Sequence, residues 1–345
     1  MTRIGVEADG KTHDVVIGPL NALPAGILIT DEHVWSLHSS RLPDTDPIFV
    51  PQGEAAKSWA VLERLTEELA SRNAGRDTAI IALGGGSIGD VAGLAAALFK
   101  RGCRLIHVPT TLVAQVDSAI GGKVAIDSAG LKNVVGTFYL PEVVFCDPAF
   151  LATLDRRHLR AGYAELVKYG LIDDPAMFAW SEAHAGELLV GDSDLMAEGV
   201  AKAVMAKARF VRDDFHDKLG QRALLNFGHT FGHAVESLAG FGPVLHGEAV
   251  AVGMALAFQL SVDLRLCPAS DSERAIGHLR SVGLPTTLAE AHVAGRAQEL
   301  AALMAKDKKA DASGLKLILT RGIGKAVMSG DVTPDQLAAF LVRAA

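Results

Sequence analysis

The chain has 345 residues, enough for two domains of ordinary size, and 49% of them are apolar, which excludes a disordered protein. The formal net charge of −7 argues against nucleic acid or an anionic membrane as a partner. The three cysteines are far apart, with no CxxC pair, and the N-terminus lacks the apolar run of a signal peptide. These features predict a cytoplasmic protein with reduced thiols and no nucleic-acid or membrane partner.

Residues 1–150 alternate short apolar runs with amphipathic stretches, a pattern typical of an α/β domain with a mostly parallel sheet. The predicted helices are Trp59–Ser71 and Val91–Phe99. The predicted strands are Asp14–Ile17, Ile27–Thr30, Ile48–Val50, Thr78–Leu83, Arg104–Val108 and Val143–Cys146.

Residues 151–345 carry helical periodicity and little strand character, so a second, mainly helical domain is expected there. The only segment resembling a strand is Leu315–Leu319. No linker-like composition separates the two parts. The predicted helices are Arg157–Tyr169, Asp194–Val211, His229–Leu238, Glu248–Leu266, Ser272–Val282 and Gln298–Met304.

A glycine motif follows the predicted strand Thr78–Leu83 of the first domain. Gly84, Gly86 and Gly89 satisfy GxGxxG where a strand gives way to a helix. There the free N–H groups and the helix dipole favour a pyrophosphate, which predicts a Rossmann-like dinucleotide site. The acidic residue expected about 20 residues downstream is missing. Asp31, after another strand, can replace it or can be an ordinary helix N-cap, and the glycine turn can be purely structural.

Three histidines, His229, His233 and His246, stand in the apolar segment Arg222–Met254. A buried imidazole needs a partner, so a site is a more economical explanation than packing. Glu165 can complete a zinc set with two of them, which leaves coordination positions open for substrate. The HxxxH spacing nominates His229 and His233, but His246 suits equally well, so spacing leaves the pair open.

Two lysines lie on a polar segment that contains glycines. Lys123 follows two glycines in GGK, and Lys132 precedes an asparagine. Such lysines suit phosphate or carboxylate binding, although each taken singly also fits a solvated loop. Glu165 and Lys168 lie three apart on one helical face. They are either an ordinary surface ion pair or part of a site.

Together these segments resemble the 3-dehydroquinate synthase family over nearly the whole chain. The resemblance implies an NAD-binding α/β domain followed by a mainly helical domain for metal and substrate. Three places depart from the family pattern: Ser87, Asp127 and the stretch Asp213–Leu219. The motifs that carry the resemblance are GGGSIGD, VPTTL, QVDSAIGGK, AELVKYG, RALLNFGHTFGHA and LHGEAVAVGM.

The resemblance implies a lyase of the shikimate pathway, which leads to chorismate and the aromatic amino acids. Such an enzyme converts 3-deoxy-D-arabino-heptulosonate 7-phosphate into 3-dehydroquinate and phosphate. The steps are transient oxidation by NAD, phosphate elimination, re-reduction and an intramolecular aldol closure. The implied cofactors are NAD and one divalent metal, zinc with cobalt as the alternative, and the implied assembly is a cytoplasmic homodimer.

The resemblance also assigns residues. The metal ligands are Glu165, His229 and His246, which makes His233 a substrate-facing group. The implied NAD-binding residues are Asp31, Gln52, Gly53, Glu54, Lys57, Gly85, Gly86, Ser87, Ile88, Gly89, Asp90, Thr110, Thr111, Lys123, Lys132, Phe150 and Thr153. The implied catalytic and substrate-binding residues are Asp117, Lys123, Asn133, Lys168, Lys207, Arg222, Asn226, His233 and Lys308, with Arg101 reaching across the homodimer interface.

Three alternatives remain at this stage. Another sugar-phosphate cyclase would act on sedoheptulose 7-phosphate or glucose 6-phosphate, but Lys123 in GGK better suits a substrate with a carboxylate. A metal-dependent polyol or glycerol-phosphate dehydrogenase would accumulate NADH. A nucleotide- and metal-binding regulatory protein would show no turnover.

Overall fold

A computed structural model describes residues 1–43, 45–240, 242–307 and 315–344. The chain divides into two compact units, of which unit 1 comprises Met1–Asp155 and Gly191–His216. Unit 2 comprises Arg156–Val190 and Asp217–Ala345. This division differs from the predicted one because Gly191–His216 lies in unit 1. That segment contains the whole of α6 (Ser193–Asp213), which packs on strand β1 of the same unit.

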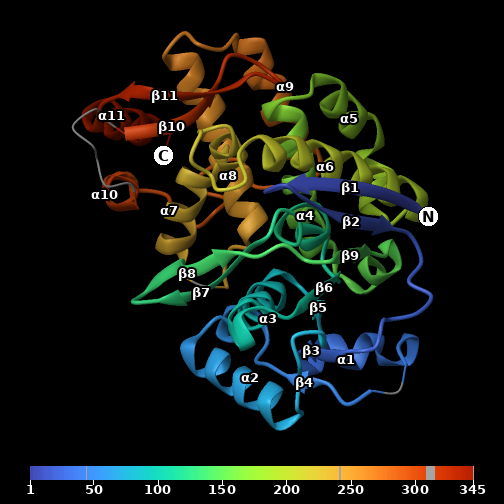
Figure 1. Cartoon of the computed structure of the whole chain (residues 1–345). Coiled ribbons are helices and arrows are strands. Elements are labelled where there is room, and N and C mark those ends of the chain that lie inside the picture. Colours follow the sequence, from blue (N-terminus) through green and yellow to red (C-terminus); the bar gives the residue numbers. More distant parts are fainter. Residues whose placement is uncertain (44, 241, 308–314, 345) are drawn as a thin grey trace. The chain divides into compact units, whose positions relative to one another are not determined.

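The centre of unit 1 is a seven-stranded sheet with the order β1-β2-β9-β6-β5-β3-β4. The N-terminal hairpin of β1 (Thr2–Ala8) and β2 (Lys11–Ile17) is antiparallel. Every other pairing in this sheet is parallel, which confirms the predicted sheet type (Figure 1). The remaining strands are β3 (Ile27–Thr30), β4 (Ile48–Phe49), β5 (Ala79–Gly84), β6 (Arg104–Pro109) and β9 (Val143–Cys146).

Strand β5 shows why the parallel strands appear in the sequence as continuous apolar runs. Ile80 packs with Leu65 and Leu94 of two helices on one face of the sheet. Its neighbour Ile81 packs with Ile106 on the other face. A parallel strand buried on both faces loses the polar alternation of a half-exposed strand. The other helices of unit 1, besides α6, are α1 (Glu32–His38), α2 (Trp59–Ser71) and α3 (Gly86–Leu98).

A separate hairpin, β7 (Lys123–Ser128) and β8 (Leu131–Phe138), was not predicted. Most residues of β8 are exposed, so the segment has no apolar periodicity to mark it as a strand. The N-terminal strand β1 and the helix α1 were also missed. Helix α3 begins at Gly86, earlier than predicted, because the glycine motif forms its first turn.

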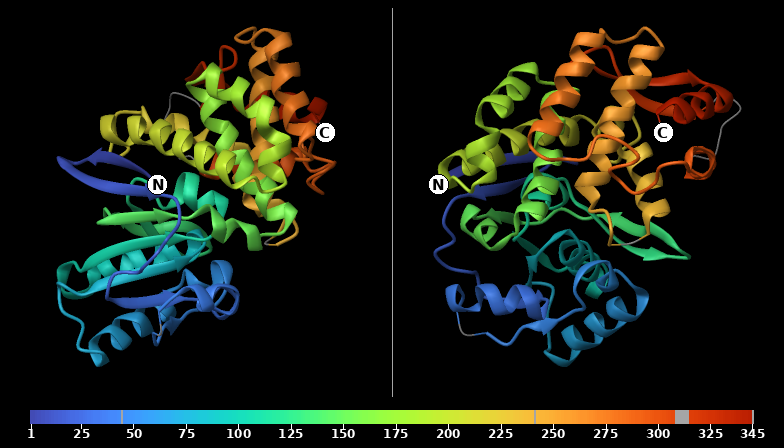
Figure 2. Two further views of the ribbon diagram at one scale, coloured as in Figure 1. Left: turned by 90° about the vertical axis from the view of Figure 1, so that its right-hand side faces the viewer. Right: turned by 180° about the vertical axis from the view of Figure 1, so that it is seen from behind.

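Unit 2 is mainly helical, as predicted, and Figure 2 shows it from two further directions. Helices α7 and α8 lie side by side (Figure 1). Helices α5 and α11 and strand β11 were not predicted. The helices are α4 (Arg156–Ile172), α5 (Pro175–Leu189), α7 (His229–Ala239), α8 (His246–Asp263), α9 (Ala269–Ser281), α10 (Ala297–Asp307) and α11 (Pro334–Ala344), and the strands are β10 (Leu315–Thr320) and β11 (Ala326–Val332).

The close approach of α7 and α8 depends on glycine. A Cβ atom at Gly253 would lie 1.9 Å from the carbonyl oxygen of Gly228. We expect Gly253→Ala to lower the free energy of unfolding by about 3 kcal/mol, because the two backbones must separate. The measurement is the thermal midpoint. Gly277→Ala on α9 is the matched control, because open space surrounds that position and an alanine there should stabilise the helix. Equal shifts of the thermal midpoint in both variants would contradict the packing argument.

Two buried histidines make the stability of unit 1 depend on pH. Burial lowers the pKa of His13, on β2, and of His107, on β6, to about 4 each. Both side chains ionise near pH 6.5 in an unfolded chain, so the fold favours their neutral forms. The contribution of the two neutral histidines to the free energy of unfolding should be fully present above about pH 6.5. It should be lost as the pH decreases toward 4. Urea unfolding between pH 8 and 5 measures the free energy of unfolding as a function of pH, and His13→Leu should make it change less with pH. An unchanged pH dependence in this variant would refute the role of His13.

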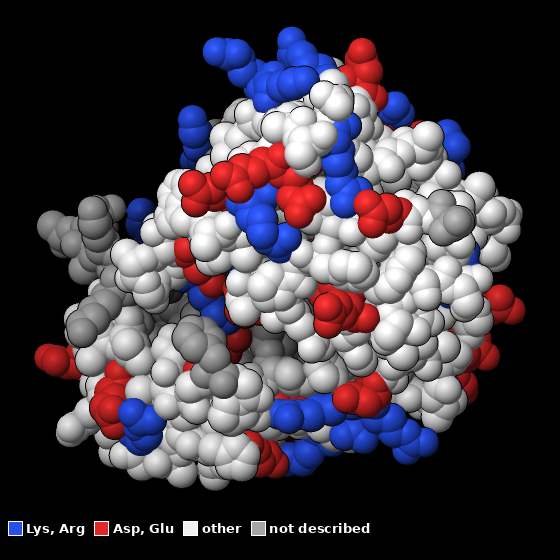
Figure 3. Space-filling view, turned by 90° about the horizontal axis from the view of Figure 1, so that it is seen from below, with Lys and Arg blue, Asp and Glu red and all other residues white. Residues whose placement is uncertain are grey.

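On the face drawn in Figure 3, basic (blue) and acidic (red) side chains lie beside one another, and no large patch carries a single charge sign. Within the described part of the chain, no helix is both long enough and apolar enough to span a membrane.

Candidate metal centre and nucleotide site

Three side chains from three helices of unit 2 meet at Glu165. Glu165 lies on α4, while His229 and His246 are the first residues of α7 and α8. The Nε2 atoms of both histidines are 3.4 Å from Oε1 of Glu165. Two imidazole nitrogens and a carboxylate oxygen, all within 4.8 Å of one another, form a donor set that suits a divalent metal.

The second ring nitrogen of each histidine also has a partner. Nδ1 of His229 is 3.3 Å from the carbonyl oxygen of Phe227, and Nδ1 of His246 is 3.2 Å from a carboxylate oxygen of Glu236. Both partners accept hydrogen bonds, so a proton on each Nδ1 leaves the lone pair on Nε2. Both lone pairs would then be available to a metal placed beside Glu165. Burial opposes the charge of His246, but Glu165 and Glu236 raise its pKa to about 10. Sequence reasoning missed Glu236, which stands seven residues after His229 on the same helix face.

Glu165 is fully buried, and among the described residues neither of its oxygens makes a hydrogen bond of normal geometry. Nζ of Lys168, itself 1% exposed, is 2.5 Å away. Burial opposes ionisation, but the charge of Lys168 and the two histidines outweigh it and hold the pKa of Glu165 well below its usual range. Burial likewise lowers the pKa of His229 to about 3. An ionised carboxylate and a neutral imidazole are the forms that bind a metal.

The structure separates the histidine pairs that spacing left open. His233 is exposed, and its ring centre is 5.5 Å from that of His229. The grouping that includes Glu165 contains His229 and His246, whereas His233 groups with Glu236 and His246. The HxxxH interpretation is therefore not supported by the geometry, because His229 and His233 do not belong to a common grouping.

Two further predicted substrate residues of unit 2, Arg222 and Asn226, lie just before the start of α7. Arg222 is buried and Asn226 is exposed, and both belong to the short 3-10 segment Arg222–Asn226 that precedes the helix. Lys308 lies outside the described residues.

In unit 1 the glycine motif forms the turn between β5 and α3. Gly84 has φ 154°, and a Cβ atom there would lie 2.3 Å from Cδ1 of Ile88. Gly85 is the N-cap of α3 and has no side chain to cap the helix. The turn lines a narrow cavity, where the buried Oγ of Ser118 has no hydrogen-bond partner among the described residues. A bare helix N-terminus beside an unsatisfied hydroxyl fits a nucleotide phosphate.

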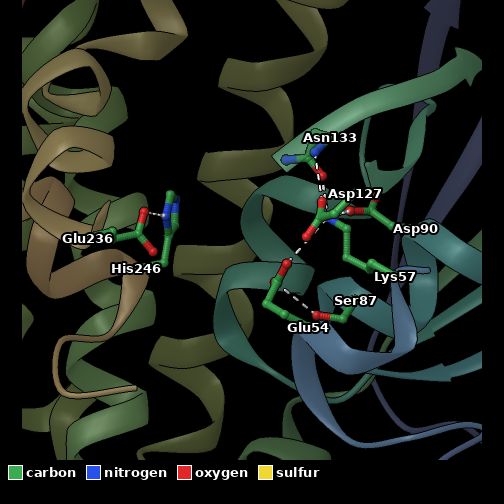
Figure 4. Close-up of polar contacts among 8 residues, drawn as sticks. All are labelled: Glu54, Lys57, Ser87, Asp90, Asp127, Asn133, Glu236 and His246. Atoms are coloured by element: carbon green, nitrogen blue, oxygen red, sulfur yellow. Dashed lines mark hydrogen bonds and ion pairs between the residues drawn. The ribbon is translucent and has the colours of Figure 1, made fainter. Parts of the chain in front are cut away.

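Lys57 is the centre of a charged cluster beside this turn (Figure 4). Its Nζ atom is 2.7 Å from Asp90, 3.9 Å from Glu54 and 4.0 Å from Asp127. Burial opposes the charge of Lys57, but Asp90 and Glu54 raise its pKa above the ordinary value. Burial raises the pKa of Asp90 to about 6 although Lys57 opposes the rise. Ser87, on the first turn of α3, donates to Glu54 at 3.2 Å.

The β7–β8 hairpin contributes to the same cluster. Asn133 has a left-handed backbone (φ 54°), and its side-chain oxygen accepts a hydrogen bond from Lys57. Its backbone N–H donates to Asp127 over 2.8 Å. Asp127, which departs from the family pattern, therefore holds the backbone of β8 at Asn133 across the hairpin. Lys132, the neighbouring residue, is exposed.

The remaining predicted nucleotide residues lie at the ends of the parallel strands. Asp31 follows β3 and accepts a hydrogen bond from the Val34 N–H at 2.7 Å, so it caps α1 as the ordinary interpretation predicts. Thr110 is buried and Thr111 half-buried after β6, and Phe150 and Thr153 lie in a 3-10 segment after β9. Gln52 and Gly53 are exposed at the segment that leads to Lys57.

Asp117 and Lys207 form an ion pair within unit 1, and Nζ of Lys207 also donates to the carbonyl oxygen of Asp117 at 2.6 Å. Lys207 lies on α6 and is buried. The pair is one of the contacts that α6 makes within unit 1, beside its packing on β1. Lys123 is exposed at the start of β7, and Arg101 is exposed with a left-handed backbone (φ 63°).

Comparison with known proteins identifies the family. A model of the 3-dehydroquinate synthase N-terminal domain matches residues 47–161, and one of the C-terminal domain matches residues 162–310. The chain is 49% identical over 325 residues to the 3-dehydroquinate synthase of Zymomonas mobilis subsp. mobilis, which covers 91% of this chain and 86% of that protein.

Two solved structures resemble the whole fold. The 2-epi-5-epi-valiolone synthase of Streptomyces hygroscopicus subsp. jinggangensis, with NAD⁺ and Zn²⁺ bound, is 29% identical, with a TM-score of 0.86 and 96% of each chain covered. A 2-deoxy-scyllo-inosose synthase complexed with carbaglucose-6-phosphate, NAD⁺ and Co²⁺ is 27% identical, with a TM-score of 0.86 and both chains fully covered. The matched domains and the extent of identity show that the chain belongs to the 3-dehydroquinate synthase family.

Proposed function

We propose that this chain converts 3-deoxy-D-arabino-heptulosonate 7-phosphate into 3-dehydroquinate and phosphate, as a carbon–oxygen lyase that depends on NAD and a divalent metal. Family membership supports the reaction. The observation that carries the proposal is the arrangement of Glu165 against the Nε2 atoms of His229 and His246, with the buried Lys168 beside it.

The donor set in unit 2 fits zinc, with cobalt as the alternative, because two imidazoles and one carboxylate leave coordination positions for a substrate. When bound, the metal supplies Lewis acidity toward a substrate oxygen, and NAD supplies reversible hydride acceptance. Gly85, Gly86 and Lys57 of unit 1 are our candidates for holding NAD. The relatives with NAD⁺ and Zn²⁺ or Co²⁺ bound support both assignments.

The chain's own side chains supply placement and charge. Lys168 and Arg222 of unit 2 are our candidates for the basic groups that hold substrate oxygens, and fixed charges of this kind cost no reorganisation during the reaction. Lys207 of unit 1 stays a separate candidate. His233 and Asn226 are exposed and lie close to the donor set in sequence. His233 can exchange protons with substrate hydroxyls, and Asn226 can hydrogen-bond to them. In the reaction the carbon–oxygen bond to phosphate breaks, phosphate leaves and a carbon–carbon bond closes the ring. The hydride that NAD⁺ accepts in the oxidation returns to the substrate in the re-reduction, so the overall reaction is not a redox reaction.

Several parts of this function stay predictions. They are the homodimer, the role of Arg101 across its interface, the individual contacts of Asp117, Lys123 and Asn133, and the cytoplasmic location.

A second candidate is a cyclase that acts on another sugar phosphate, since both solved relatives are cyclases with the same fold. Phosphate release from three substrates distinguishes the candidates. The zinc-loaded protein with NAD should release phosphate from the heptulosonate phosphate, and not from sedoheptulose 7-phosphate or glucose 6-phosphate. Faster release from either of these two would replace the proposed substrate.

A further inference from the structure

We infer that Glu236 is a positioning residue that sets the metal affinity of unit 2 through His246. This inference rests on the proposed metal site. In Figure 4 the carboxylate of Glu236 points at the imidazole of His246, and Nδ1 and Oε2 are 3.2 Å apart.

The two ring nitrogens of His246 face two different carboxylates. Nδ1 faces Glu236, and Nε2 lies 3.4 Å from Glu165. A neutral imidazole carries one N–H, and an ionised carboxylate only accepts hydrogen bonds. A hydrogen bond from Nδ1–H to Glu236 therefore leaves the Nε2 lone pair directed at the donor set. A ligating histidine held by a carboxylate in this way is also a better electron donor.

The position of Glu236 in the fold suits this role. Helix α7 carries His229 at its first position and Glu236 seven residues later, so both side chains leave the same face of the helix. Glu236 is buried, whereas the side chain of His246 is 37% exposed. A half-exposed ring at the first position of α8 has freedom to rotate, and a buried carboxylate on the neighbouring helix restricts that freedom. Helix α7 thus supplies one ligand and orients another.

An alternative use of the same atoms makes Glu236 a direct ligand, since His233, Glu236 and His246 also form a compatible grouping. The positions of the rings favour the positioning role. His229 has the same arrangement as His246, with Nδ1 on an acceptor and Nε2 toward Glu165. The exposed His233 contributes only to the second grouping.

The test measures zinc affinity by chelator competition, without substrate or NAD. Glu236→Gln should weaken zinc binding about 10–100-fold, the usual effect of removing such a partner. In the cobalt-loaded protein it should shift the visible absorption bands while keeping their number and intensity class. Glu248→Gln is the matched control, because Glu248 stands on the same turn as His246 but pairs with Arg157 and the Leu245 N–H; its zinc affinity should not change.

Three outcomes would overturn the inference. Unchanged zinc affinity in Glu236→Gln, with the wild type binding zinc, removes the role of Glu236 and leaves the proposed function intact. Loss of zinc in His233→Ala together with retention in His229→Ala makes Glu236 a direct ligand instead. Failure of the folded wild-type protein to bind zinc or cobalt refutes the metal site itself.

Discussion

Glu165→Gln should remove the metal and with it the turnover of the enzyme. The substitution keeps the volume of the side chain but eliminates the only anionic member of the Glu165, His229 and His246 set. The loss of zinc affinity should exceed the roughly 10–100-fold effect expected for an outer partner such as Glu236. Chelator competition and dehydroquinate formation measure the two consequences.

The same substitution leaves Lys168 buried without its carboxylate, which should cost about 3–5 kcal/mol of stability. The double variant Glu165→Gln with Lys168→Met separates this effect from metal binding, because it removes both buried charges and should recover most of the lost stability. A folded double variant that binds one zinc with the wild-type affinity would contradict the ligand assignment.

Lys57→Met should destabilise unit 1 and weaken NAD binding. The side chain of Lys57 is 4% exposed and faces Asp90, Glu54 and Asp127, so its removal leaves three carboxylates to repel one another. We expect a loss of about 3 kcal/mol in the free energy of unfolding near neutral pH. The loss should shrink as the pH decreases toward about 6, because Lys57 lowers the pKa of Asp90 and, without it, this carboxyl takes up its proton at a higher pH. Urea unfolding and NAD titration are the measurements.

Lys202→Met is the control for this prediction. Lys202 forms an exposed ion pair with Glu198, 3.3 Å away on α6 of the same unit. Such surface pairs contribute about 0–1 kcal/mol, so the control should change neither stability nor NAD affinity appreciably. Equal effects of the two substitutions would show that the buried cluster around Lys57 has no special role.

The strands and helices that the sequence revealed are those with a strong apolar pattern. Ile27–Thr30 and Trp59–Ser71 were predicted with the bounds that the structure shows. The β7–β8 hairpin was missed because its outer strand is largely exposed. The assignment of Gly191–His216 to unit 1 could not be predicted either, since it depends on the packing of α6 against β1 (Thr2–Ala8), which lies far earlier in the sequence.

The metal set shows a similar limit. The residue types in Arg222–Met254 indicated a site, but spacing alone could not choose between His233 and His246. The choice depends on how α4, α7 and α8 pack around Glu165, which spacing does not reveal. The resemblance to the family nominated His246, and this assignment stays a prediction. Glu236 left a weak signal, a glutamate seven residues after His229 on an apolar helix face, which could have been noticed.

The central claim is that the chain catalyses a cyclisation in which NAD is used and regenerated. The most direct measurement follows phosphate, dehydroquinate and the absorbance of NADH together, in one reaction of zinc-loaded protein, NAD⁺ and the heptulosonate phosphate. The account predicts phosphate and dehydroquinate in equal amounts, without net NADH. Stoichiometric NADH without phosphate release would contradict it and would indicate a dehydrogenase.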